Sequence, residues 1–264
     1  MNYRNKKKVE NLKIVKISAI EKKHVYIELK LNQENSEIFP GQFVQVLVPG
    51  NPKVFLRRPF SVHDYDSKNK ILSLLIKIVG EGTMTLSKMK LGEYLNIIYP
   101  LGNGFTMPEE DDILLVGGGC GVAPLLYLAR CLSDKGYSPD ILLGASAKNE
   151  ILYPEKYSKF GNISFITEDG SLGDKGLVTQ HEILKNKLSH YSKIYACGPD
   201  PMMKAIGKLA IKNNVECEVS LENLMACGIG ACLCCVVNTD EGNVCTCTEG
   251  PVFAVTKLQN WLEE

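Results

Sequence analysis

Hydrophobic positions in the first part of the chain follow the short period of β-strands. Strands are expected at residues 25–31, 43–48, 71–79 and 94–99. Turn residues such as Pro40 and Gly41 separate these runs, and only residues 83–89 have the pattern of a helix, with Thr83 as its N-cap. Several short strands at this spacing predict an antiparallel barrel that ends near residue 107.

The pattern changes after residue 108, where short apolar strands alternate with helices. Strands are expected at residues 113–116, 141–145, 163–167, 194–197 and 216–219, and helices at 122–135, 177–188 and 201–212. This alternation predicts a parallel sheet covered on both faces. We therefore expect a multidomain β plus α/β fold with three domains, at residues 9–107, 108–218 and 219–264, the last one small and rich in cysteine.

Composition narrows the functional classes. With 264 residues the chain exceeds the needs of one ordinary core, and 30 Lys+Arg against 30 Asp+Glu leave no basic surplus for nucleic acid. The basic start has no apolar segment behind it, so no signal peptide is expected. The longest uncharged run, 113–129, is broken by glycines and a proline, which argues against a membrane span and favours a cytoplasmic protein.

Six of the ten cysteines lie within residues 227–247, near the carboxyl end. Cys227, Cys232 and Cys235 form a C-x4-C-x2-C motif, the spacing typical of a plant-type [2Fe–2S] cluster. Gly228 and Gly230 permit the positive φ angles with which a backbone wraps around such a cluster. A zinc site or a set of buried free thiols is the alternative, although zinc sites more often use two separated C-x2-C pairs.

The fourth ligand of such a cluster has to be Cys245 or Cys247. A hairpin with Glu241 and Gly242 at its tip would pair Val236 with Cys247 and would place Cys245 roughly 7 Å farther from the other ligands. We therefore predict Cys247 as the ligand, and Cys234 as a thiol that takes no part.

Two short segments of the predicted barrel carry chemistry suited to a flavin. In Arg58-Pro59-Phe60-Ser61 the guanidinium suits a pyrophosphate and the hydroxyl suits a flavin ring. The glycine turn before Thr83 opens a helix, where free N–H groups favour phosphate. An ordinary strand edge and a simple helix cap are the alternative interpretations.

A glycine loop between a strand and a helix predicts a dinucleotide site. Gly117, Gly118, Gly119 and Gly121 occupy this loop, which departs from G-x-G-x-x-G because Pro124 replaces the last small residue. The segment Cys197-Gly198-Pro199 follows a later strand and is expected at the same carboxyl edge of the sheet. Residues 144–149 contain no arginine for a 2′-phosphate, which favours NAD over NADP, with Lys148 as the alternative cation for NADP.

In this order the motifs resemble the ferredoxin–NADP+ reductase superfamily. With the cysteine loop and the ending Cys247-Thr-Glu-Gly-Pro-Val-Phe253, the chain from Val9 onward resembles the electron-transfer subunits of NAD-dependent, class 1B dihydroorotate dehydrogenases. The resemblance implies an FAD-binding barrel, an NAD-binding domain and a [2Fe–2S] domain. It implies FAD contacts at Arg58, Pro59, Phe60, Ser61, Leu75, Ile76, Lys77, Gly82 and Thr83, and cluster ligands Cys227, Cys232, Cys235 and Cys247.

The same resemblance implies a partner. Dihydroorotate would be oxidised at FMN in a separate catalytic subunit, and electrons would pass through the cluster and FAD to NAD+ in pyrimidine (UMP) biosynthesis. We expect a heterotetramer of two catalytic and two electron-transfer subunits, with Cys197 and Glu222 near the contact between nicotinamide and flavin. The alternatives are a reductase subunit of a transhydrogenase, hydrogenase or sulfur-reductase complex, and a redox-inert zinc-binding interaction module.

Overall fold

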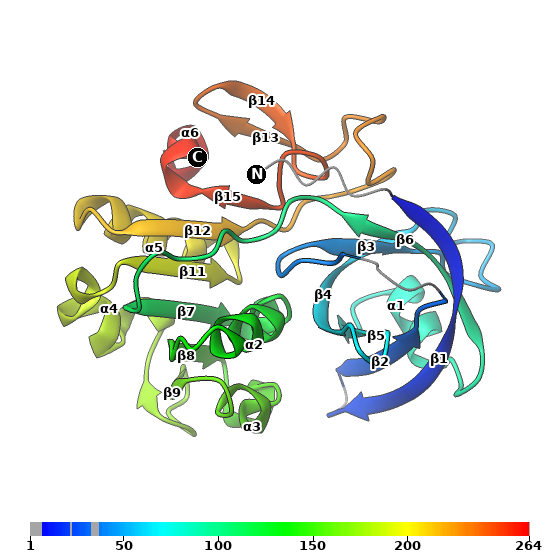
Figure 1. Ribbon diagram of the computed structural model, residues 1–264, viewed down its shortest axis with the longest axis horizontal. Helices are drawn as coiled ribbons and strands as arrows, with labels where there is room; N and C mark the ends of the chain where they lie inside the picture. Colours follow the sequence, from blue (N-terminus) through cyan, green and yellow to red (C-terminus); the bar gives the residue numbers. More distant parts are fainter. Residues whose placement is uncertain (1–6, 22, 33–36, 264) are drawn as a thin grey trace.

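The amino-terminal part of the chain forms a closed six-stranded antiparallel barrel, as predicted. The computed structural model describes residues 7–21, 23–32 and 37–263, and Figure 1 shows the barrel beside a separate sheet. The strands follow the order β1-β2-β5-β4-β3-β6 around the barrel. Their bounds are Lys8–Ile20 (β1), His24–Lys30 (β2), Phe43–Val46 (β3), Arg58–Asp66 (β4), Ile71–Lys77 (β5) and Tyr94–Leu101 (β6).

The barrel helix α1 (Glu81–Ser87) begins earlier than its pattern suggested. Gly80 is the N-cap, so the prediction of Thr83 as N-cap was wrong. Thr83 lies in the first turn instead, and its Oγ1 accepts hydrogen bonds from the backbone N–H groups of Val79 (2.9 Å) and Gly80 (3.1 Å). A hydroxyl at this position satisfies backbone donors that the helix start leaves unpaired.

The second part of the chain forms the expected sheet with the strand order β10-β9-β8-β7-β11-β12-β15. All neighbours are parallel except β15, which pairs antiparallel with β12 and comes from the cysteine-rich tail. The strands are β7 (Ile113–Gly118), β8 (Asp140–Ala145), β9 (Asn162–Thr167), β10 (Asp174–Lys175), β11 (Lys193–Cys197), β12 (Glu216–Ser220) and β15 (Val252–Ala254).

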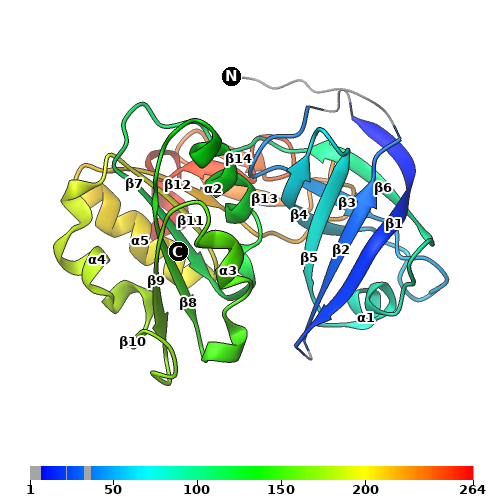
Figure 2. The same ribbon diagram turned by 60° about the horizontal axis from the view of Figure 1, so that its bottom comes forward.

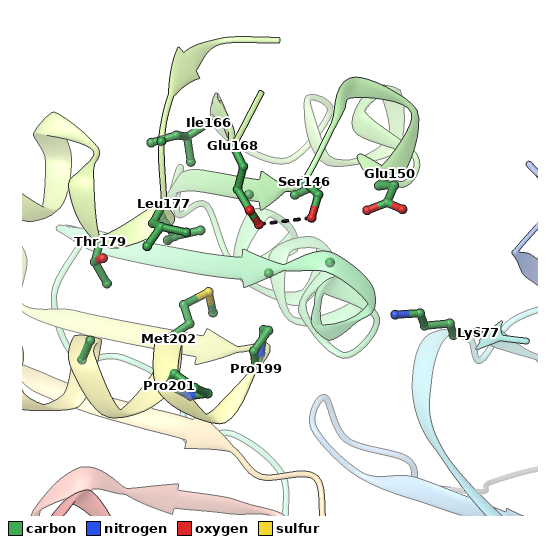
Figure 3. Close-up of a pocket in the computed structure, with 17 residues that line it drawn as sticks. Lys77, Ser146, Glu150, Ile166, Glu168, Leu177, Thr179, Pro199, Pro201 and Met202 are labelled. Atoms are coloured by element: carbon green, nitrogen blue, oxygen red, sulfur yellow. Dashed lines mark hydrogen bonds between the residues drawn. The ribbon is translucent and has the colours of Figure 1, made fainter. Parts of the chain in front are cut away.

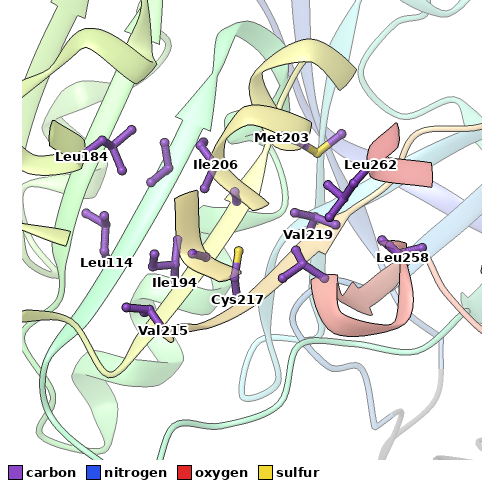
Figure 4. Close-up of a cluster of buried hydrophobic side chains, with 14 of the residues drawn as sticks. Leu114, Leu184, Ile194, Met203, Ile206, Val215, Cys217, Val219, Leu258 and Leu262 are labelled. Carbon is purple, nitrogen blue, oxygen red and sulfur yellow. The ribbon is translucent and has the colours of Figure 1, made fainter. Parts of the chain in front are cut away.

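Helices cover both faces of this sheet because successive side chains of each strand point to opposite sides. On β7, Leu114 belongs to the apolar cluster that includes side chains of α4 and α5 (Figure 4), whereas Leu115 belongs to the cluster with side chains of α2 and α3. Figure 2 shows the helices that flank the sheet. The helices are α2 (Leu125–Asp134), α3 (Pro154–Tyr157), α4 (Glu182–Asn186), α5 (Asp200–Lys212) and α6 (Gln259–Glu263).

Two of the helices expected here differ from their prediction. The one expected at 122–135 starts with a 3-10 turn, Gly119–Val122, and becomes α-helical only after Pro124, which caps α2. The one expected at 177–188 is interrupted. His181 is extended (φ −64°, ψ 144°) and its Nδ1 accepts a hydrogen bond from the backbone of Ile183, so that α4 starts anew there.

The cysteine-rich tail crosses from the sheet to the barrel side. Residues 221–235 contain no helix or strand, and a hairpin of β13 (Val236–Thr239) and β14 (Gly242–Cys245) follows. In this hairpin Val236 pairs with Cys245 rather than with Cys247, so the predicted register was wrong. The tip is Asp240 and Glu241, one residue earlier than the predicted tip. The tail is thus divided between the large sheet, which β15 joins, and a separate two-stranded sheet of β13 and β14.

Candidate functional site

A pocket opens where the barrel, the glycine loop and the tail meet. The barrel contributes the whole segment Arg58–Ser61 of β4, Leu75 and Lys77 of β5, and Thr83 of α1. The other walls come from residues far apart in the chain, among them Cys120, Ala123, Leu221, Glu222, Asn223 and Met225. Most of the side chains that sequence analysis selected for a flavin therefore line one surface, which we call the flavin-side pocket.

Two residues of the predicted flavin set do not line this pocket. Ile76 is fully buried in the barrel core, because alternation along β5 turns it away from Leu75 and Lys77. Gly82 lies directly beneath Arg58, and a β-carbon at Gly82 would come within 3.2 Å of the Arg58 Nε atom. The glycine therefore leaves room for the guanidinium rather than offering a contact of its own.

A second pocket lies at the carboxyl edge of the parallel sheet (Figure 3), and we call it the nucleotide-side pocket. Predicted residues Gly118, Gly119 and Pro199 line it, together with side chains that were not predicted as site residues, including Ser146, Glu150, Glu168, Thr179 and Met202. The Ser146 hydroxyl donates a hydrogen bond to Oε1 of Glu168 (3.1 Å). Lys77 lines both pockets, and Figure 3 shows its ammonium reaching from the barrel toward the sheet.

The glycines that do not line this pocket allow two loops to touch. A β-carbon at Gly121 would lie 2.4 Å from the Cα atom of Gly198, and one at Gly117 would lie 2.7 Å from Cγ1 of Val122. Real side chains do not tolerate such distances. The glycine loop and the Cys197–Pro199 segment thus meet at one edge of the sheet, where open α/β sheets bind ligands.

Cys120 and Cys197 both lie near these loops. Only Cys120, which was not predicted as a site residue, lies in a pocket wall. Cys197 lines neither pocket: it is buried, its Sγ lies 3.4 Å from the Ser220 carbonyl, and burial raises the pKa of its thiol well above the usual value. Cys120 lines the flavin-side pocket, where burial raises its pKa to about 11. Its position inside the glycine loop was the available signal.

Glu222 lies in the wall of the flavin-side pocket, as part of the segment that leads to the cysteines. The surrounding protein raises the pKa of its carboxyl group, and the nearby charge of Asp200 acts in the same direction. Its side chain is nevertheless open to solvent because it faces the pocket. Such a carboxyl group retains a proton to higher pH than a free one.

Backbone N–H groups surround the sulfur atoms of the cysteine loop. The N–H of Ile229 points at Sγ of Cys227 (3.4 Å), and that of Gly230 points at Sγ of Cys247 (3.2 Å). Gly228 (φ 69°) and Gly230 (φ 85°) have the positive φ angles expected of a wrapping loop. Burial opposes ionisation of Cys227, but donors in the loop prevail and lower its pKa to about 6. Thiolates are the form that binds metal.

Cys235 and Cys247 lie side by side, since the Cys247 backbone N–H points at Sγ of Cys235 (3.4 Å). A [2Fe–2S] cluster takes two thiolates on each of two irons. The cysteine loop supplies such donors, and backbone N–H groups already point at the sulfur atoms of Cys227 and Cys247, so the donor set fits the cluster.

The structure also bears on the choice between Cys245 and Cys247. The register argument no longer holds, but Cys247 is only 1% exposed and receives the Gly230 N–H, while Cys245 is more open. Cys235 and Cys247 pack against Phe43 and Leu101 of the barrel, and Met225 joins this contact. Cys234 is exposed. Two of the predicted ligands, Cys235 and Cys247, thus adjoin the barrel wall beside Met225, which also lines the flavin-side pocket.

Comparisons with known proteins match this arrangement. Residues 11–105 match the family model of the oxidoreductase FAD-binding domain, and residues 222–259 match that of the iron–sulfur cluster binding domain of dihydroorotate dehydrogenase B. The part of the chain that the structure describes holds no helix of the length and apolar character needed to cross a membrane.

Solved structures share the fold over most of its length. A chain in the structure of an NADH-dependent reduced ferredoxin-NADP oxidoreductase is 28% identical with a TM-score of 0.85, covering 96% of this chain and 92% of that one. A ferredoxin reductase of carbazole 1,9a-dioxygenase is 20% identical with a TM-score of 0.68, covering 79% of this chain and 67% of that one, and supports the fold alone.

Curated relatives are more similar still. The dihydroorotate dehydrogenase B (NAD(+)) electron transfer subunit of Caldanaerobacter subterraneus subsp. tengcongensis is 41% identical over 90% of this chain and 91% of its own length. The subunit of the same name from Fusobacterium nucleatum is 34% identical, over 96% of this chain and 99% of its own length. The chain therefore belongs to the family of dihydroorotate dehydrogenase B electron transfer subunits.

Proposed function

We propose that this chain carries electrons from the FMN of a dihydroorotate-oxidising catalytic subunit, by way of a [2Fe–2S] cluster and FAD, to NAD+ in pyrimidine (UMP) biosynthesis. The supporting observation is the continuity of three sites. Lys77 lines both the flavin-side and the nucleotide-side pocket, and Met225 lines the flavin-side pocket while packing beside Cys235 and Cys247. A flavin accepts electrons singly or as a hydride, and so connects one-electron with two-electron carriers.

In this proposal Arg58, Lys77 and Thr83 bind FAD phosphates and Ser61 contacts its ring, because these side chains line the flavin-side pocket. Cys227 and Cys232 hold one iron, and Cys235 and Cys247 hold the other. The thiols of this set need a reducing compartment, which supports a place in the cytoplasm. Pro59, Phe60 and Leu75 supply apolar walls.

The nucleotide-side pocket supports NAD rather than NADP as acceptor. Glu168 and Glu150 line it, and an acidic side chain near the end of a strand suits a ribose 2′-hydroxyl while repelling a 2′-phosphate. Gly118, Gly119 and Pro199 bring backbone close to the ligand, with Gly117, Gly121 and Gly198 allowing their approach. We assign Glu222 to the contact between nicotinamide and flavin. Cys197 lines neither pocket, so we propose that it supports this contact from the buried side of the pocket wall.

Exposed apolar side chains around the cysteine loop support docking of the catalytic partner there. Leu224 is 81% exposed, Leu233 67% and Ile229 45%, all within the segment that carries the proposed ligands. Clustered exposed apolar residues on a protein surface typically mark an interaction site. A partner on this face would bring its FMN next to the cluster, and we propose two copies of each subunit in the complex.

The experiment is co-purification with an FMN-binding dihydroorotate dehydrogenase subunit, followed by an assay of dihydroorotate-dependent NAD+ reduction. Cys232→Ser is expected to lower this activity by orders of magnitude while retaining NADH-dependent dye reduction, which needs only FAD. The matched control is Cys234→Ser, an exposed cysteine of the same loop, with both activities retained. A complex that contains flavin but no iron, or full activity of Cys232→Ser, would contradict the proposal.

A second candidate follows from the similar solved structure of the NADH-dependent reduced ferredoxin-NADP oxidoreductase. In that case the chain would serve a ferredoxin- and NADP-linked complex. The partner separates the two functions, and so does the nucleotide: we expect NAD+ to be reduced far faster than NADP+. Faster reduction of NADP+, with no binding of the FMN subunit, would favour the second candidate.

A further inference from the structure

The side-chain amide of a buried glutamine lies beneath the cysteine loop, with no hydrogen-bond partner among the described residues. Gln45 belongs to β3, and its side chain is 0% exposed. Within the described ranges, neither its Nε2 nor its Oε1 atom has a partner. Buried amides are nearly always hydrogen bonded, because leaving one unpaired loses the interaction with water without replacement. An amide in this state therefore indicates a ligand that completes its environment.

The Gln45 amide is directed at the loop that follows the first predicted cluster ligand. A β-carbon at Gly228 would lie 2.7 Å from the Nε2 atom of Gln45 and 2.6 Å from its Cγ atom. Gly228 is the neighbour of Cys227, so the amide touches the loop at its start. On the same wall of the barrel, Phe43 of β3 packs with Cys235 and Cys247.

A second buried glutamine, three residues earlier, shows what a structural role looks like. Oε1 of Gln42 accepts a hydrogen bond from the Phe39 backbone (2.8 Å), and its Nε2 donates to the Gly102 carbonyl (2.8 Å). Gln42 is 1% exposed, so the two side chains are equally buried. They differ in that Gln42 is satisfied by the barrel itself, whereas Gln45 faces the cysteine loop with both polar atoms unpaired.

We propose that Gln45 is a positioning residue that donates a hydrogen bond from Nε2 to a sulfur atom of the cluster and thereby raises the cluster's reduction potential. This inference rests on the proposed [2Fe–2S] site. Reduction adds a negative charge to the cluster, and a donor aimed at sulfur stabilises the reduced form more than the oxidised one. Because the donor is buried, solvent does not replace it when it is removed.

The test is the midpoint potential of the cluster in the purified complex, measured by a dye-mediated titration followed by electron paramagnetic resonance. Gln45→Met keeps the length of the side chain and removes the donor. We expect the equilibrium constant for reduction of the cluster to fall about fivefold. This corresponds to a midpoint potential more negative by about 40 mV. Gln42→Met is the control: it removes two hydrogen bonds and is expected to lower stability without moving the potential.

A potential of Gln45→Met equal to that of the unaltered protein, at full iron content, would overturn the inference, as would an equal shift in Gln42→Met. If Gln45→Met does not fold, a second measurement on the unaltered protein still tests the inference. With 15N in the glutamine side chains, the reduced cluster should show a 15N hyperfine coupling, and its absence would also overturn the inference. A preparation without iron would instead refute the proposed function, so the two failures are distinguishable.

Discussion

The barrel and the cysteine segment differ in what stabilises their conformation. The barrel closes six strands around apolar side chains such as Leu72, Leu74 and Ile97, all fully buried. Residues 221–235 have no regular secondary structure and expose Leu224 and Leu233. The barrel thus has a core and a closed ladder of strand pairs of its own, whereas we expect the conformation of the cysteine segment to depend on what its sulfur atoms bind. Each of the following experiments changes one of these two regions and asks how the other responds.

Removal of iron should have the largest effect. An anaerobic chelator is expected to abolish the cluster absorbance and dihydroorotate-dependent NAD+ reduction, because metal binding supplies much of the order of a segment without a core. Hydrogen exchange should accelerate across 221–235 and stay slow in β2, β4 and β5. Loss of protection in the barrel strands at the same iron content would show that the two regions are not independent.

Truncation of a side chain in the barrel core should destabilise the barrel and leave the iron content unchanged. Leu74 is fully buried on β5, and Leu74→Ala is expected to lower the free energy of unfolding by about 2–5 kcal/mol. Denaturant unfolding of the purified protein measures this loss. The iron content of the folded variant should not change, and Leu91→Ala, at a position 68% exposed, is the matched control with little effect. Iron lost in proportion to stability would contradict the comparison.

Acid should weaken the barrel side through His63. Burial and the charge of Lys156 lower its pKa to about 4, although its Nδ1 lies 2.9 Å from the Ala123 carbonyl. The unfolded chain binds the proton near pH 6.5, so this contribution to stability is complete above that pH. It is lost as the pH falls from 6.5 toward 4, by up to about 3 kcal/mol. Unfolding free energies at several pH values measure the slope, which His63→Phe should reduce.

The smallest effect is expected from Cys245→Ser. Cys245 ends β14 and is more exposed than Cys247, so we expect a change in stability below about 1 kcal/mol and full iron content. Iron analysis and the visible spectrum check this expectation. Loss of the cluster in Cys245→Ser, together with retention in Cys247→Ser, would reverse the assignment of the fourth ligand.

Most of the architecture was predictable from the sequence, because period and turn residues determine which segments become strands. The register of the β13–β14 hairpin was not, since it depends on whether the chain turns at Asp240 and Glu241 or one residue later. The pocket walls were predictable only where a motif exists. Asn223 carries no motif, and it reaches the flavin-side pocket only because β12 ends beside the barrel.

The pairing of Ser220 with Val252 has a mechanical consequence for electron transfer. The chain leaves the large sheet at β12 and returns to it at β15, and the Leu221 N–H is hydrogen bonded to the Pro251 carbonyl (2.8 Å) at the base of this excursion. The metal-binding excursion is therefore clamped at both ends and cannot swing like a carrier on a flexible tether. Its distance to the flavin is set by the scaffold, so transfer between them requires no domain movement.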